Sequence, residues 1–194
     1  MSSREKILSA VKMNQPAPEP QPGVGAVNAI RFADGFAQFS AVLKNIGGTI
    51  LEVSGMDEVA AYVKHSFAGE ACITTIPGLT GVSMVAENID PHSLQHTALA
   101  VIQAQFAVAE NGAVWVTEQD YLVRALPFIC SHLAVIIDKK HIVNNMHEAY
   151  DLIRDADYGF GVFIAGPSKT ADIEQSLVLG AHGPKTMTVF VISG

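Results

Sequence analysis

The feature that most restricts the fold of this chain is a pair of almost wholly apolar segments, HLAVIID at 132–138 and MTVFVIS at 187–193. A strand with one face in water alternates apolar and polar side chains, whereas a strand covered on both faces is apolar throughout. Segments with the apolar spacing of helices alternate with such strands along the chain. This order predicts an α/β fold with an open, mostly parallel sheet and helices on both faces of the sheet.

The spacing of apolar residues and the positions of Gly and Pro give the expected elements. Helices are expected at 2–13, 34–48, 56–67, 118–130, 143–156 and 168–183. Strands are expected at 49–53, 71–76, 113–117, 132–138, 158–166 and 187–193, with strand character towards the end of 97–110 and one weak strand in the loop-rich stretch 77–93. The short turn inside 104–117 predicts one antiparallel pair in an otherwise parallel sheet.

A proline-rich segment, NQPAPEPQPG at 14–23, separates the first expected helix from the rest of the chain. Its four prolines remove amide donors and favour an extended backbone. The helix before it is too short to form a core, so it must dock on another surface or fray. We therefore expect a helix and proline-rich arm over 1–29 and one α/β domain over 30–194. The arm could join two copies of the chain in a homo-oligomer.

Charge and composition exclude several classes of function. The 194 residues are enough for one sizeable core, and the net charge of −7 comes without a Lys/Arg stripe. Binding to nucleic acid or to an anionic membrane is therefore not expected. The polar start and the lack of a run of about 18 apolar residues predict no signal peptide and no transmembrane helix, hence a cytoplasmic protein.

The cysteines and histidines do not have the pattern of a metal site. Cys72 and Cys130 lie far apart in apolar runs, and two thiols alone cannot hold a four-thiolate zinc or iron–sulfur site. No histidine pair has the H-E-x-x-H or a comparable spacing. We expect no metal and no cofactor in this chain, and two free thiols in a reducing compartment.

The stretch FIAGPSKTADIEQSLVLGAHGPK at 163–185 is the stronger candidate for a binding site. An expected strand ends at Gly166 and an expected helix follows, so free amide groups and the positive end of the helix dipole would meet a small anion there. Lys169 would add a formal charge. Plain helix capping explains the same pattern. The candidate ligand-binding residues are Gly166, Pro167, Ser168, Lys169, Thr170, Asp172 and Glu174, with His182 and Gly183 further along.

The turn in AENGAVWVTE at 109–118 is the second candidate. Asn111 and Gly112 suit the positive φ angles of a tight hairpin, and that requirement alone accounts for both residues. If the turn faces a cleft instead, Glu110 would be a partly desolvated carboxylate able to act as a nucleophile or base. Both interpretations remain open at the level of sequence.

Three stretches together resemble the lactate utilization protein C family, also called the LUD domain family. They are FIAGPSKTADIEQSLVLGAHGPKTMTVFVI, HLAVIIDKKHIVNNMHEAYDLI and AENGAVWVTE, and the similarity runs over roughly 30–194. The resemblance implies a fold similar to the sugar-phosphate isomerase and CoA-transferase superfamily. It also implies a role in oxidising L-lactate to pyruvate, together with partner subunits that carry iron–sulfur clusters.

In the wider superfamily, class I CoA-transferases carry a Ser-Glu-Asn-Gly stretch whose glutamate forms a thioester. The matching residues here are Ala109, Glu110, Asn111 and Gly112, and the first position departs from that pattern. Three hypotheses follow. The chain is a ligand-binding subunit of a lactate-oxidising system with an anion cleft at the carboxyl ends of the strands, a free-standing enzyme acting on a CoA ester or phosphorylated small molecule through Glu110, or a sensor of lactate or pyruvate.

Overall fold

In the computed structural model, a parallel sheet forms the centre of the molecule. The structure describes residues 2–20, 28–86, 88–154, 156–171, 177–180 and 182–193. In these ranges, every neighbouring pair in the main sheet is parallel. Its six strands, in spatial order, are β1 (Thr49–Val53), β12 (Thr186–Ile192), β7 (His132–Asp138), β4 (Leu99–Gln103), β2 (Cys72–Thr74) and β3 (Ser83–Met84). The expected α/β class and mostly parallel sheet are confirmed.

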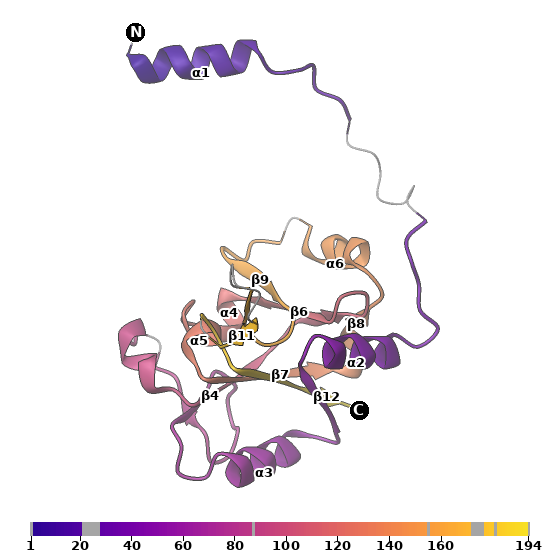
Figure 1. The fold of residues 1–194 in the computed structure, drawn as a ribbon, viewed down its shortest axis with the longest axis vertical. Coiled ribbons are helices and arrows are strands. Elements are labelled where there is room, and N and C mark those ends of the chain that lie inside the picture. The colour runs from indigo at the N-terminus through magenta and orange to yellow at the C-terminus, as the bar shows by residue number, and fades with distance from the viewer. Residues whose placement is uncertain are drawn as a thin grey trace.

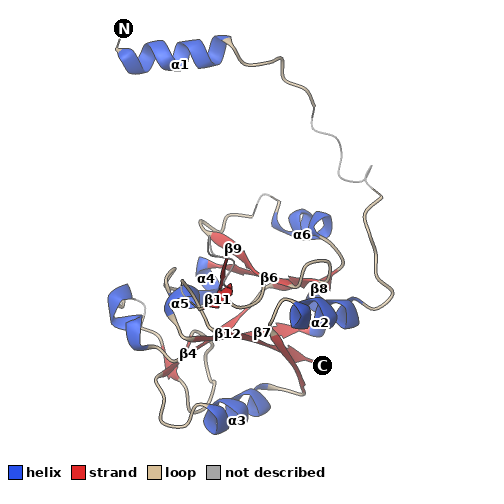
Figure 2. Ribbon diagram, viewed as in Figure 1, coloured by secondary structure: helices blue, strands red, loops and turns tan. Residues whose placement is uncertain are grey.

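A second sheet of mixed direction lies on one face of the main sheet (Figure 2). Its strands, in order, are β8 (Ile142–Val143), β5 (Phe106–Val108), β6 (Ala113–Thr117) and β9 (Gly161–Ile164). The chain passes from β4 to β5 through only Ala104 and Gln105. The antiparallel pair expected within 104–117 is present as β5 and β6, but it belongs to this second sheet and not to the main one.

Helices lie on both outer sides of the two sheets, as Figure 1 shows. The helices of the described residues are α1 (Ser3–Met13), α2 (Gly35–Asn45), α3 (Met56–Ser66), α4 (Glu118–Tyr121), α5 (Leu126–Ile129) and α6 (Met146–Ile153), with 3₁₀ turns at Pro91–His96 and Lys139–His141. Helix α3 covers the outer face of the main sheet, and α6 lies on the far side of the second sheet. Helix α1 buries none of its side chains.

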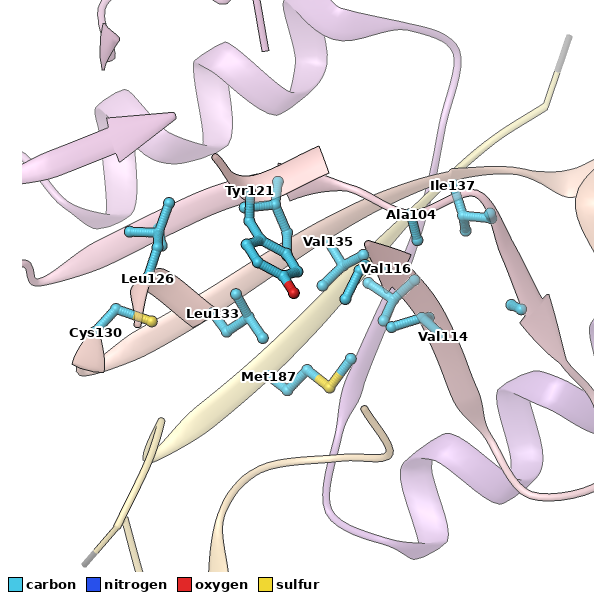
Figure 3. Close-up of a cluster of buried hydrophobic side chains, with 14 of the residues drawn as sticks. Ala104, Val114, Val116, Tyr121, Leu126, Cys130, Leu133, Val135, Ile137 and Met187 are labelled. Carbon is cyan, nitrogen blue, oxygen red and sulfur yellow. The ribbon is translucent and has the colours of Figure 1, made fainter. Parts of the chain in front are cut away.

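Side chains alternate between two cores along each central strand, as the period of a strand requires. On β7, Leu133, Val135 and Ile137 point into the core shared by the two sheets and α2, whereas Ala134 and Ile136 point towards α3. Figure 3 shows part of the shared core, including the fully buried Tyr121. Because strands of both sheets contribute to that core, neither sheet can be removed without exposing the other.

The helix expected at 118–130 is wrong, because the structure has two short helices there. Helix α4 ends where Leu122 adopts a φ of 59°, a conformation that is strained for a leucine. Helix α5 carries Pro127 in its first turn, where the missing amide donor costs nothing. One continuous helix would have placed this proline in its interior.

The helix expected at 168–183 is also wrong. The described residues form a hairpin instead, in which β10 (Lys169–Ala171) pairs with β11 (Leu177–Leu179) in antiparallel fashion. The open end of the hairpin is closed by backbone hydrogen bonds from Gly180 N to Ser168 O at 3.0 Å and from Ser168 N to Pro184 O at 2.9 Å. Pairing between two segments therefore replaces the local helix signals, and no helix dipole is present at Ser168.

Candidate functional site

The two stretches selected from the sequence meet at the end of α2. Val114 on β6 pairs with Ile164 on β9, and continuing that antiparallel register places Gly112 opposite Gly166. A Cβ atom at Gly112 would lie 3.2 Å from the Leu43 backbone nitrogen, and one at Gly166 would lie 3.0 Å from the Ile46 carbonyl oxygen. Both glycines also have a φ near +70°. Only glycine meets both requirements, so these turns are built for close approach to α2.

Lys169 extends over the same place. Its Nζ and Cε atoms, and the ring of Pro167, would each lie 3.6 Å from a Cβ atom at Gly47, in the turn between α2 and β1. We call the three turns around Gly47, Gly112 and Gly166 the glycine cluster. The cluster lies beside the start of β1, so it is at the amino-terminal edge of the main sheet. Gly166 does follow a strand, as expected, but that strand is β9 of the second sheet.

Glu110 and Asn111 hold the backbone of the turn and of α6. The Oε2 atom of Glu110 accepts a hydrogen bond of 2.9 Å from the backbone N–H of Met146, the first residue of α6. The Oδ1 atom of Asn111 accepts one of 3.0 Å from Ala113 N. The carboxylate thus sits at the positive end of a helix, where a negative charge is stabilising. This contact supplies a structural role for Glu110.

The remaining candidates lie along the hairpin that leads into β12. A Cβ atom at Gly183 would lie 3.0 Å from the Ser168 Cβ, so these two residues are in contact, while His182 is exposed. Thr170 belongs to β10. Asp172 and Glu174 lie outside the described residues. The structure therefore brings Gly112, Gly166, Pro167 and Lys169 together and places Ser168 and Gly183 next to the start of β12.

A cavity of about 380 Å³ opens at the amino-terminal edge of the main sheet, next to that hairpin. We call it the amino-edge cavity. Its polar and aromatic lining comes from Ser66, Phe67, Glu70, Ser131, His132 and Lys185. The backbone N–H of Lys185 donates to Ser131 O at 2.8 Å, which fixes the start of β12 beside the start of β7. This cavity is not among the sites predicted from the sequence. Its sequence signal is a polar pair where each of two apolar strands begins, Ser131-His132 at β7 and Lys185-Thr186 at β12.

The charged groups in the lining of the amino-edge cavity are Lys185 and Glu70, and the His132 imidazole beside them is uncharged near neutral pH. Burial, followed by the positive charge of Lys185, lowers the pKa of His132, and the charge of Glu70 acts in the opposite direction. The Nδ1 atom of His132 lies 2.8 Å from Thr186 Oγ1, and its ring packs edge-on against Phe67 at 5.3 Å between ring centres. An ammonium group, hydroxyl groups and an imidazole in a small cavity suit a small organic anion.

The thiols and other metal-binding side chains are dispersed. Burial raises the pKa of the Cys130 thiol to about 12, and burial and the charge of Glu70 raise the pKa of Cys72. These thiols belong to the two opposite cores, so each behaves as an inert packing residue. Within the described ranges, no group of three His, Cys, Asp or Glu side chains is placed to hold a metal ion. No helix in those ranges is long and apolar enough to cross a membrane.

The fold combines a parallel six-stranded sheet with a mixed second sheet on one face, and glycine turns close on the end of α2. The chain is therefore an α/β protein of two stacked sheets. Residues 91–192, more than half of the chain, match the LUD domain, and the chain belongs to the LUD domain family. The resemblance read from the sequence is confirmed.

Relatives and a solved structure agree with this assignment. The chain is 33% identical to lactate utilization protein C of Bacillus pumilus over 96 residues, covering 46% of this chain and 40% of that protein. It is 32% identical to lactate utilization protein C of Anoxybacillus flavithermus over 108 residues, covering 55% and 48%. The chain thus spans less than half of these relatives.

A crystal structure of a DUF162 family protein from Deinococcus radiodurans has a similar fold. The TM-score is 0.65 at 16% identity, and the match covers 85% of this chain and all of that one. At this level of identity the similarity concerns the fold alone.

Proposed function

We propose that this chain takes part in lactate utilization by binding lactate or pyruvate in the amino-edge cavity. The observation that carries the proposal is the placement of Lys185, His132 and Ser131 around one small cavity. The similarity to proteins named lactate utilization protein C supports the choice of anion. We place the anion here and not in the cleft expected at the carboxyl ends of the strands, because the described residues of 168–183 form a hairpin where that expectation needed a helix.

The lining matches the groups of a short hydroxy or keto acid. The Lys185 ammonium would pair with the carboxylate, and the Ser131 hydroxyl would donate a hydrogen bond to the same group. The uncharged His132 imidazole would form a hydrogen bond with the oxygen on the second carbon of lactate or pyruvate, accepting from a hydroxyl or donating to a carbonyl. Phe67 would contact the methyl group. Glu70 would oppose a second negative charge, which favours monoanions over phosphates and dicarboxylates.

We further propose that the chain works as a subunit of a lactate-oxidising system. Oxidation of lactate to pyruvate releases two electrons and two protons, and partner subunits with iron–sulfur clusters would accept the electrons. Co-elution of the chain with such partners on gel filtration checks the assembly. Elution of the chain alone in the presence of the partners, at every concentration, would contradict it.

Calorimetric titration of the full chain with L-lactate, pyruvate and acetate tests the anion site. Lys185→Ala should weaken lactate or pyruvate binding at least tenfold, because the ammonium group that would pair with the carboxylate is lost. Lys169→Ala is the matched control, since Lys169 is an exposed lysine of the neighbouring glycine cluster. Unchanged binding in Lys185→Ala, with a loss in Lys169→Ala, would move the anion to the glycine cluster and overturn the assignment.

A further inference from the structure

A second cavity of about 520 Å³ lies between the second sheet and α6, on the side where β4 and β7 end. We call it the carboxyl-edge cavity. Gln105 enters its lining just after β4, and Lys140 and His141 enter it just after β7. None of its lining residues is shared with the amino-edge cavity. Ligands of open α/β sheets bind most often beyond the carboxyl ends of the strands, so this position is favourable for binding.

The apolar wall of the carboxyl-edge cavity is largely aromatic. Trp115 and Phe106 lie nearly parallel, with 19° between their rings and 6.3 Å between the ring centres, and Tyr158 meets Trp115 edge-on at 5.3 Å. On the α6 side, Ile153 is buried whereas Leu152 keeps 58% of its surface exposed. An exposed leucine beside aromatic rings leaves apolar surface that a ligand would cover.

The polar groups of this cavity have unused hydrogen-bonding capacity. Trp115 keeps 6% of its surface exposed, and its indole N–H makes no hydrogen bond to any described residue. The Nε2 atom of Gln105 donates to Thr117 Oγ1 and to Asp120 Oδ2, both at 3.1 Å, which leaves its Oε1 atom as a free acceptor. The amide of Gln119 makes no hydrogen bond within the described part of the chain.

We propose that the carboxyl-edge cavity binds a planar nitrogen heteroaromatic compound. Such a ring places hydrogen-bond acceptors and donors in the plane of an otherwise apolar body. The indole N–H of Trp115 would meet a ring nitrogen or carbonyl oxygen, and the Gln105 and Gln119 amides would complete the pairing of the ring edge. A ligand ring in the cavity would supply partners for these three polar side chains.

The charges at the rim are balanced, which argues against recognition by charge alone. Lys140 Nζ is bound to Asp138 Oδ2 at 2.8 Å, and Asp157 lies in the lining together with His141. A phosphate without a ring would find no unpaired lysine there. The ring is therefore the recognised part of the ligand, and any attached sugar or phosphate would extend towards solvent.

Calorimetric titration of the full chain with adenosine, riboflavin and ribose 5-phosphate tests the proposal. Adenosine or riboflavin should bind with one-to-one stoichiometry, and ribose 5-phosphate should not. Ala156→Trp, at an exposed residue of the lining, should abolish binding by filling the cavity. Ala61→Trp is the matched control at an exposed alanine of α3, and it should bind normally.

A second variant examines the unpartnered donor. Trp115→Phe keeps an aromatic ring on β6 but removes the indole N–H together with part of the aromatic surface, so ring binding should weaken several-fold while the fold stays intact by circular dichroism. Failure of both ring compounds to bind, or equal binding in Ala156→Trp and wild type, would overturn the proposal. Lactate binding at Lys185 should be unchanged in all of these variants, so the two sites fail or succeed separately.

Discussion

Glu110 is the residue at which a structural and a chemical interpretation compete. Its carboxylate accepts the backbone N–H of Met146 at the start of α6, and Asn145, the N-cap residue of that helix, is itself 98% buried. A glutamate that forms a thioester must present a free oxygen to the substrate. The geometry shows one Glu110 oxygen occupied by a helix N-terminus, which is sufficient reason for a carboxylate at this position.

Replacing Glu110 by Ala should cost about 0.5–2 kcal/mol of unfolding free energy, as the loss of a helix-capping side chain typically does. Glu110→Gln should cost less, because the amide oxygen can still accept the Met146 N–H. Urea denaturation followed by circular dichroism measures both. Incubation with a CoA thioester and borohydride, followed by intact mass, provides the opposing test: a modified Glu110 would show that the residue acts as a nucleophile.

At the scale of elements, the sequence predicts strands better than helices. The runs at 132–138 and 187–193 become β7 and β12, because burial on both faces leaves an unmistakable apolar pattern. The stretch 168–183 carries local signals of a helix start, but its backbone pairs as β10 and β11. Long-range pairing overrides local propensity there, and no periodicity within the segment reveals its partner.

The candidate site likewise contains residues that can be recognised from local sequence and residues that meet only through long-range pairing. Gly112 and Gly166 are recognisable in the sequence as turn residues, and the structure adds that both close on the end of α2. The amino-edge cavity could not be read from the sequence, because His132 and Lys185 are 53 positions apart and meet only through the pairing of β7 with β12. Which strands become neighbours in a sheet cannot be read from a short segment of sequence, so neither can the contacts between their ends.

The boundary between the arm and the domain is also a matter of elements. Hydrogen bonds between the start of the domain and α6 begin at Ile30. The backbone carbonyl oxygen of Ile30 accepts a hydrogen bond from Asn145 Nδ2 at 2.8 Å, and the backbone N–H of Phe32 donates one to Asn144 Oδ1 at 2.9 Å. The backbone from residue 30 is therefore tied to the start of α6. Helix α1, by contrast, buries none of its side chains.

A chain shortened to begin at residue 30 should keep the melting temperature of the full chain to within about 2 °C, because its buried core is intact. Scanning calorimetry measures this, and a chain shortened to residue 34 is the comparison that should lose stability. Sedimentation of both the full and the shortened chain reports whether the arm joins two copies. A large drop in melting temperature on removing 1–29 would show that the arm is part of the folded domain.

For the molecule as a whole, titration of His132 couples stability to pH. Burial and Lys185 lower its folded pKa below the ordinary value, so the unfolded chain binds the proton more readily. Its contribution to stability is therefore complete above about pH 6.5 and is lost as the pH falls towards the folded pKa. The lowered pKa values of Glu52 and Asp138 act only in more acidic solution.

Urea denaturation at pH 7.5 and at pH 5.5 measures this effect. The wild-type chain should be less stable at the lower pH, and His132→Gln should show a smaller difference between the two, because it has no imidazole to protonate. His92→Gln is the matched control, since His92 is an exposed histidine outside the cavity. An equal pH dependence in wild type and His132→Gln would assign the effect to other groups.

The position of β12 in the main sheet has a consequence for biosynthesis. Strand β12 inserts between β1 and β7, with Thr49 of β1 paired to Thr188. While the ribosome makes the chain, β1 emerges about 140 residues before β12, with which it pairs, at a synthesis rate of about 5–20 residues per second. For many seconds the nascent chain carries β1 and α3 without the strand that would join them to β7. During this interval the apolar surfaces of β1 and α3 that the sheet later buries are available to a chaperone. The sheet closes late, when residues 186–192 have been made.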